Sequence, residues 1–238
     1  MIKMIVARVG KEDKSDKFDD YLGPSMKNFT NIPMLEIFNS DNDSMFAKYN
    51  RGIKSFDVQD DDIIVFCHAD VKILDPNFDK KLEIIFKKKK NVGLVGMIGT
   101  TQFPLAGGWW LCDHSLHRGH LIQGMPGSDG KKTFHMNRKT GYFEDLVSVD
   151  GFCFAVRGKV AKEIPFDETT YPNSYHFYDC DMSLSVLEKG WDIAVADILL
   201  EHSSEGPLPS SWHQNKLKFI KKWQDKGYVF PINKGQFK

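Results

Sequence analysis

Cysteine is scarce in this chain, and the four cysteines are not spaced as metal ligands. None of them lies in a CxxC pair, which is the spacing typical of zinc ribbons and zinc fingers, so we disfavour a structural zinc site. Three of the four lie within apolar or mixed segments. This pattern indicates buried, reduced thiols in a reducing compartment.

Net charge and long apolar runs are missing as well. Thirty-two basic and thirty-two acidic residues cancel, which argues against nucleic acid or a strongly anionic membrane as a partner. No run reaches the roughly 18 apolar residues of a membrane-spanning helix, so we expect no transmembrane segment. The first apolar run is too short for a signal peptide, and we therefore expect a cytoplasmic protein.

The remaining composition is that of an ordinary folded protein. Aromatic residues make up 13% and charged residues 27% of the 238 residues, a length that suits one α/β domain with a core of its own. Neither an internal repeat nor a linker stands out. We therefore expect one domain that spans residues 1–238.

The first part of the chain alternates between strand-like and helix-like patterns. Apolar runs at 4–7, 34–38 and 63–67 predict strands, and apolar residues at helical spacing predict a helix over 45–56. A short helix is expected at 18–22, ended by the Gly-Pro pair that follows. The run at 63–67 is typical of a strand buried on both faces. This order predicts a Rossmann-like, mostly parallel sheet flanked by helices.

The later part of the chain continues this pattern around one exception. Residues 101–148 are rich in glycine and histidine and show no clear period, so we expect an irregular insertion that includes a mobile segment. The spacing of its three clustered histidines does not place them on one helix face, which disfavours a zinc site. The other expected elements are helices over 75–90, 181–189 and 215–223 and strands over 92–99, 147–156 and 191–200.

Three short polar motifs carry the candidate chemistry. His68 and Asp70 follow the most apolar strand, and ligands of open α/β sheets bind beyond the carboxyl ends of strands. A carboxylate there can hold a divalent cation on two phosphates, helped by a histidine. The alternative is that Asp70 only caps the next loop.

The other two motifs lie near the end of the chain. Asp179 and Asp181 come just before an expected helix, where one carboxylate can cap the helix and the other can act as a general base. His202 follows an expected strand. It can be a metal ligand or a structural histidine.

In this order, the motifs resemble those of family 2 glycosyltransferases, which have the GT-A fold. Within that resemblance, the chain belongs with the glycosyltransferase-like branch that carries HxD in place of DxD. The matching residues extend from about residue 4 to residue 206. They are Asn50-Arg-Gly52, His68-Ala-Asp70, Val149-Asp150-Gly151-Phe152, Tyr178-Asp179-Cys-Asp181, Gly190-Trp191 and His202-Ser-Ser204. Two positions depart from the family pattern: His68 replaces the usual first aspartate of the metal motif, and Tyr178 replaces the usual glutamate before Asp179.

The resemblance implies an inverting transfer of a sugar, of the hexose or deoxyhexose class, from a nucleotide diphosphate to a saccharide or other hydroxyl acceptor. It implies Mn²⁺ or Mg²⁺ held by Asp70 and His202, with Asp179 as the general base. Residues 1–100 would bind the nucleotide-sugar, 101–206 would form the acceptor and catalytic half, and 207–238 a helical tail. The expected substrate-binding residues are Asp41, Asn50, His68, Trp109, Trp110, Asp150, Gly151 and Asp181.

Two other functions remain open from the sequence. A nucleotidyltransferase would also use a nucleotide-binding sheet and a metal, but it normally has a glycine-rich, basic phosphate loop, and residues 7–11 offer little of that kind. A degenerate nucleotide- or sugar-binding module without turnover is favoured by the presence of His68 in the metal motif.

Overall fold

The central feature of the computed structural model is a six-stranded sheet in the order β12-β5-β11-β3-β1-β2. The model describes residues 1–10, 16–39, 43–125, 133–203 and 208–237. Strand β1 is parallel to β2 and β3, and β5 is parallel to β12, whereas β11 is antiparallel to both of its neighbours. The predicted mostly parallel sheet is therefore confirmed. Its strands are β1 (Ile2–Ala7), β2 (Met34–Ile37), β3 (Ile63–His68), β5 (Val92–Gly96), β11 (Cys153–Arg157) and β12 (Asp192–Val195).

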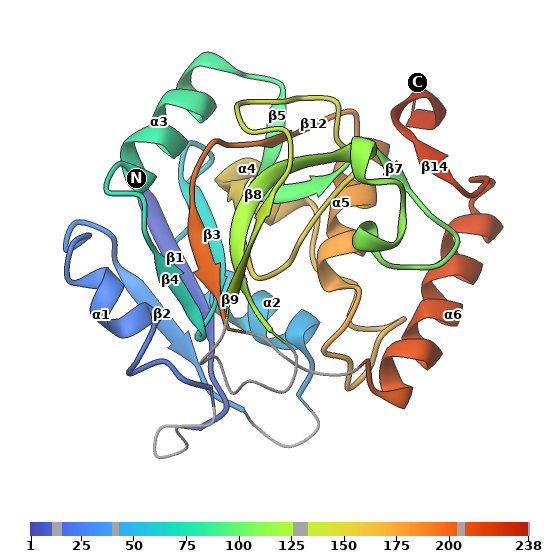
Figure 1. Cartoon of the computed structure of the whole chain (residues 1–238). Helices are drawn as coiled ribbons and strands as arrows, with labels where there is room; N and C mark the ends of the chain where they lie inside the picture. The colour runs from blue at the N-terminus through green and yellow to red at the C-terminus, as the bar shows by residue number, and fades with distance from the viewer. Residues whose placement is uncertain (11–15, 40–42, 126–132, 204–207, 238) are drawn as a thin grey trace.

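Helices cover both faces of this sheet (Figure 1). Alternate residues of β3 point to opposite sides: Ile64 and Phe66 join one apolar cluster, and Val65 and Cys67 join another. Helices α2, α4, α5 and α6 complete the first cluster, and α1 and α3 complete the second. The helices are α1 (Leu22–Met26), α2 (Met45–Ser55), α3 (Phe78–Lys88), α4 (Gly158–Glu163), α5 (Tyr178–Glu188) and α6 (Ser210–Asp225).

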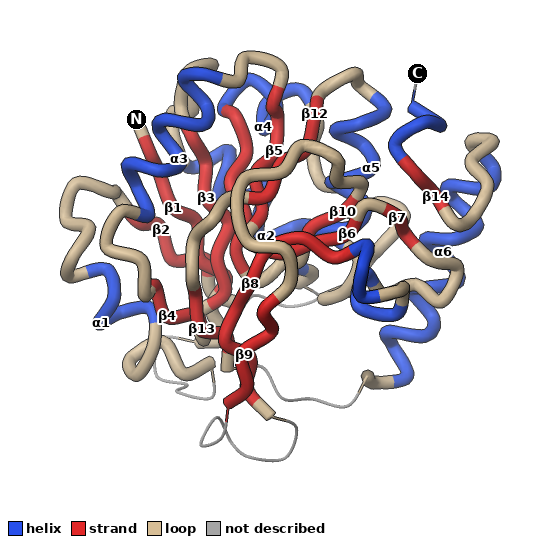
Figure 2. Tube along the Cα trace, turned by 45° about the horizontal axis from the view of Figure 1, so that its top comes forward, coloured by secondary structure: helices blue, strands red, loops and turns tan. Residues whose placement is uncertain are grey.

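A second sheet crosses the carboxyl end of the first, in the order β10-β6-β8-β13-β4, with β9 paired to β8 (Figure 2). Its strands are β4 (Val71–Ile73), β6 (Ile98–Thr100), β8 (His117–Gly124), β9 (Thr133–Asn137), β10 (Ser148–Val149) and β13 (Leu200–His202). The short strands β7 (Gln102–Phe103) and β14 (Ile232–Asn233) pair apart from it, and the 3₁₀ turns are η1 (Trp109–Leu111), η2 (His114–Leu116) and η3 (Lys234–Phe237).

The segment 101–148, expected to be irregular, contributes strands β8 and β9 to this sheet, while its described residues 104–116 and 138–147 lie in turns, 3₁₀ turns and loops. Strand β8 shows no regular alternation of buried and exposed residues, and it pairs along its length with three strands, β6, β9 and the distant β13. Gly119 lies in β8 with φ of +95°, where a Cβ atom would come within 2.1 Å of the Met97 carbonyl oxygen. Residues 126–132, within the segment predicted to be mobile, lie outside the described residues.

Several element boundaries differ from the sequence prediction. Helix α1 covers Leu22–Met26, whereas we expected a helix over 18–22 that the Gly-Pro pair ends. Pro24 is tolerated because it lies in the first turn, where its missing amide has no intrahelical partner to lose. Helix α5 begins at Tyr178, directly after Phe177 with φ of +69°, so both Asp179 and Asp181 lie inside its first turn. The strands expected over 92–99, 147–156 and 191–200 are each divided in two, into β5 and β6, β10 and β11, and β12 and β13.

Two other local expectations agree with the structure. The Ser44 hydroxyl accepts a hydrogen bond from the Ala47 amide at 3.0 Å and so caps α2, as the polar loop before this helix predicts. Among the described residues, no helix combines the length and the apolar character needed to span a membrane.

A buried ion pair attaches α6 to α5. The Asp181 carboxylate lies 2.7 Å from the Lys222 ammonium and accepts a further hydrogen bond from the Trp223 indole at 3.1 Å. The Tyr171 hydroxyl donates to the same carboxylate, and Lys222 also pairs with Asp167 at 2.8 Å. Burial raises the pKa of Asp181 in spite of the cation beside it. Asp181 therefore acts in packing, and not as the helix cap that the sequence suggested.

Loss of this carboxylate is expected to destabilise the protein. Asp181→Asn leaves a buried lysine with only Asp167 as its anionic partner, and we expect the free energy of unfolding to fall by about 3 kcal/mol, near the lower end for a broken buried pair. Asp225→Asn is the matched control, because Asp225 pairs with Lys221 on the exposed surface of α6. Its effect should stay within about 0.5 kcal/mol. Denaturant unfolding of both variants measures this, and equal stabilities would contradict the assigned role.

Candidate active site

The candidate site lies where the two sheets meet. His68 is the last residue of β3, Asp70 occupies the turn into β4, and His202 is the last residue of β13. Strand β13 is antiparallel to β4, with His202 opposite Val71, and the Ser203 amide donates to the Asp70 carbonyl at 3.0 Å. This pairing carries His202 from the far end of the chain to the end of the central strand.

These three side chains form a compact group of ligand atoms. Asp70 Oδ1 lies 3.9 Å from His68 Nδ1 and 3.6 Å from His202 Nε2. Each residue offers one ligand atom, and these three atoms all lie within 4.8 Å of one another. No second group of this kind occurs in the described part of the chain. Two imidazole nitrogens and a carboxylate oxygen suit a divalent transition metal such as Mn²⁺.

The hydrogen bonds around the histidines also fit a metal site. His68 Nε2 contacts the Tyr178 hydroxyl at 2.5 Å, and His202 Nδ1 contacts the Gln123 amide oxygen at 3.3 Å. His202 Nε2 is buried, and no hydrogen-bond partner for it occurs among the described residues. Histidines that bind metals usually use their second ring nitrogen in this way, which leaves the first free for the ion.

Two of the three groups, Asp70 and His68, carry the charges of metal ligands at neutral pH, and a cation would displace a proton from the third. Burial acts to raise the pKa of Asp70, but the electrostatic attraction of His202 and His68 outweighs it and lowers the pKa to about 2. Burial lowers the pKa of His68 to about 4, so this ring is neutral. For His202, burial acts in the same direction, but the Asp70 carboxylate outweighs it and raises the pKa.

A cavity of about 630 Å³ opens beside the two histidines. Asp179, from the first turn of α5, lines it, as does Asp150, whose carboxylate accepts a hydrogen bond from the Trp109 indole at 2.7 Å. Burial, with a further contribution from Asp150, raises the pKa of Asp179 to about 7. A carboxyl group with this proton affinity in a cavity is suited to acid–base chemistry.

Most of the residues predicted to form the site come together around this cavity. His68, Trp109, Trp110, Asp150, Asp179 and His202 line it, and Asp70 lies within 4 Å of both histidines without lining the cavity. Gly151 lies against Tyr178, where a Cβ atom would come within 2.3 Å of the hydroxyl oxygen. Asp41 lies outside the described residues. Trp212 and Gln123 also line the cavity. The sequence did not indicate either residue, because Trp212 lies on a helix, α6, and Gln123 lies in β8, a strand that was not predicted.

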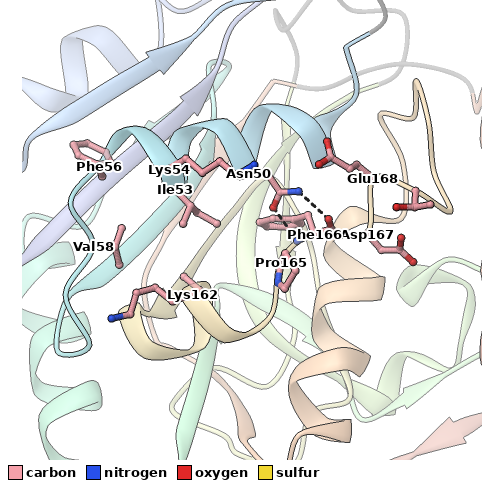
Figure 3. A pocket seen from close by; sticks show the side chains of 12 residues that line it. Asn50, Ile53, Lys54, Phe56, Val58, Lys162, Pro165, Phe166, Asp167 and Glu168 are labelled. Carbon is pink, nitrogen blue, oxygen red and sulfur yellow. Dashed lines mark hydrogen bonds between the residues drawn. The ribbon is translucent and has the colours of Figure 1, made fainter.

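Asn50 and Asp181 lie apart from this cavity. Asp181 is held by Lys222, as described above. The Asn50 side chain donates to the Phe166 carbonyl at 2.9 Å and accepts from the Phe166 amide at 3.0 Å. Figure 3 shows this pair at the wall of a different cavity, of about 660 Å³, bordered by α2 and α4. Both residues therefore have structural partners, and neither lines the cavity beside the two histidines.

Comparison with known proteins is consistent with this geometry. The model of the Glycosyltransferase like family matches residues 29–228, and no curated protein matches the chain. The solved structure of GalNAc-T7 with UDP, GalNAc and Mn²⁺ is similar at 10% identity and a TM-score of 0.57; the match covers 95% of this chain and 49% of that one, so this chain spans about half of its length. A UDP-glucose pyrophosphorylase complexed with UDP-glucose reaches only a TM-score of 0.39, at 10% identity and with 94% and 81% covered. The first similarity shows the GT-A fold that the sequence predicts.

The raised pKa of Asp179 has consequences that can be measured in the metal-free protein. Because folding raises this pKa from 3.8 to about 7, the group stabilises the fold fully below about pH 4, and this contribution is lost as the pH rises through 7. We expect a midpoint of about 7 for the Asp179 carboxyl carbon in an NMR titration. We also expect Asp179→Asn to gain stability relative to the wild type between pH 4 and pH 7.

Asp150→Asn should lower the Asp179 midpoint, because the negative charge of Asp150 contributes to the shift. Asp145→Asn is the control, since Asp145 is exposed and pairs with Arg118. A wild-type midpoint below pH 5 would contradict the burial of Asp179 described here.

Proposed function

Because this chain belongs to the glycosyltransferase-like family, we propose that it transfers a sugar from a nucleotide diphosphate to a hydroxyl acceptor, with inversion and with the help of a divalent cation. The observation that supports this most is one cavity that joins two histidines of a metal-ligand group to a carboxyl group with a pKa near 7. The solved GalNAc-T7 structure contains UDP, GalNAc and Mn²⁺, which favours a UDP-hexose and Mn²⁺ here.

In the proposed reaction, the acceptor oxygen forms a bond to the anomeric carbon while the bond from that carbon to the diphosphate oxygen breaks on the opposite face. Asp179 accepts the proton of the acceptor hydroxyl as the new bond forms. A cation held by His68, Asp70 and His202 would supply positive charge for the departing diphosphate. Each of these side chains is placed by a rigid element: a strand end, a tight turn or a helix.

The wall of the cavity suits a sugar. Trp109 and Trp110 lie edge to face at 6.0 Å between ring centroids, and Trp110 lies 6.3 Å from Trp212. Trp110 is 37% exposed. Such rings offer apolar faces for the C–H groups of a saccharide, while Asp150 fixes the orientation of Trp109 through its indole.

Two further features belong to this proposal. Residues 1–100 carry His68 and Asp70 and would serve the donor, while 101–206 carry the tryptophan pair, Asp150 and Asp179 and would serve the acceptor, with 207–238 closing the cavity through Trp212. A cytoplasmic location is supported by the four free cysteines, as expected of a reducing compartment.

Metal-dependent nucleotide binding tests the ligand group. We expect UDP to bind more tightly with Mn²⁺ than with a chelator, and Asp70→Asn to abolish most of that difference, because it replaces an anionic ligand by a neutral amide. Asp61→Asn, an exposed carboxylate before β3, is the control and should behave as the wild type. Isothermal titration of each variant measures this. Equal UDP affinity with Mn²⁺ and with chelator in the wild type would contradict metal assistance.

Removal of the base should affect turnover and leave binding intact. We expect Asp179→Asn to bind UDP with Mn²⁺ as the wild type does, and to lose about 10²- to 10⁴-fold in single-turnover transfer or donor hydrolysis. Asp181→Asn is the comparison, and should lose stability but keep its rate at a temperature where it is folded. Full turnover by Asp179→Asn together with an inactive, stable Asp181→Asn would reverse the assignment. A wild type that binds UDP but neither transfers nor hydrolyses any donor would instead favour a binding module.

A further inference from the structure

The two departures from the family pattern touch each other in the folded chain. His68 replaces the usual aspartate at the end of β3, and Tyr178 replaces the usual glutamate at the start of α5. His68 Nε2 lies 2.5 Å from the Tyr178 hydroxyl oxygen. The two replacements therefore form a single hydrogen bond beside the cavity.

We infer that Tyr178 is a positioning residue that holds His68 as the third ligand of the divalent cation, an inference that rests on the metal role proposed above. With Nε2 directed at Tyr178, the other ring nitrogen, Nδ1, is the one that faces Asp70, 3.9 Å from Oδ1. An imidazole that binds a cation through Nδ1 carries its proton on Nε2. The Tyr178 oxygen is then the acceptor for that proton.

The surroundings of Tyr178 leave its hydroxyl little freedom. The residue is 4% exposed, and its ring packs edge to face on Tyr49 and Phe46 at 5.5 and 6.3 Å between centroids. Its backbone starts α5 immediately after the left-handed Phe177. The oxygen is thus fixed in front of His68 before any ligand arrives, which lowers the entropy lost when the ligand group forms.

Gly151 makes this approach possible. A Cβ atom at position 151 would lie 2.3 Å from the Tyr178 hydroxyl oxygen and 2.6 Å from the ring carbon that carries it. Any larger residue would therefore displace the phenol from His68. The structure gives Gly151 this spacing role, in place of the direct substrate contact expected from the sequence.

The second histidine is held in a similar way. The Gln123 amide oxygen can accept the Nδ1 proton of His202 at 3.3 Å, and Nε2 then faces Asp70 at 3.6 Å. Each ring is thus hydrogen-bonded through one nitrogen, His202 to Gln123 of β8 and His68 to Tyr178 of α5. The other nitrogen of each ring faces the Asp70 carboxylate. Tyr178 is the more informative of the two supports, because it can be tested by the loss of one oxygen atom.

Mn²⁺ binding to the purified chain, followed by the loss of the free-ion EPR signal, tests the inference without any activity assay. Tyr178→Phe keeps the ring and removes the acceptor, and we expect its affinity for Mn²⁺ to fall by about 10- to 100-fold. Tyr49→Phe is the matched control: Tyr49 is equally buried and packs on Tyr178, but no described residue bonds to its hydroxyl. It should bind Mn²⁺ as the wild type does. Melting curves for each variant report folding.

Two more variants separate the possible outcomes. Gly151→Ala should weaken Mn²⁺ binding in the same direction, so the test does not depend on one substitution. If Tyr178 acts through His68, Tyr178→Phe should cause no further loss in a His68→Ala background. A further loss there, or wild-type affinity in a folded Tyr178→Phe, would overturn the inference and leave the proposed function standing. A wild type that binds no Mn²⁺, with or without UDP, would overturn both.

Discussion

The candidate site depends on one carboxylate, Asp70, placed between two histidines where the two sheets cross. Its charge outweighs the cost of burial for His202, and the attraction of His202 in turn lowers the pKa of Asp70 to about 2. In a region of low dielectric such a charge attracts any cation strongly. The same carboxylate thus holds the neighbouring rings together without a metal and offers the anionic ligand when one binds.

The rest of the fold serves to bring distant segments to this carboxylate. Strand β3 supplies His68, the β4–β13 pairing supplies His202, and the first turn of α5 supplies both Tyr178 and Asp179. Helix α6 adds Trp212 to the cavity and is held on α5 by the buried Asp181–Lys222 pair. A substitution of Asp181 or Lys222 is therefore expected to alter the cavity by displacing α6, without removing a group that takes part in the reaction.

The sequence predicted the central sheet, and it singled out most of the residues that the structure brings together around the cavity, because their signals are local. The apolar run of β3 marks a buried strand, and His68 and Asp70 follow it directly. The structural partners of Asn50 and Asp181, Phe166 and Lys222, were not predicted because they lie far along the chain. Strand β8 was missed for the same reason: its neighbours β6 and β13 are remote, and its sequence carries no period. The helix start at Tyr178 depends on the left-handed Phe177, which no local pattern signalled.

The central claim is that a divalent cation binds between His68, Asp70 and His202. The most direct measurement is anomalous diffraction at the manganese edge from crystals of the protein grown with Mn²⁺ and UDP. The account predicts one strong peak within bonding distance of His68 Nδ1, an Asp70 carboxylate oxygen and His202 Nε2, with the diphosphate on its open side. A peak held by other residues, or bound UDP with no peak at these three atoms, would contradict it.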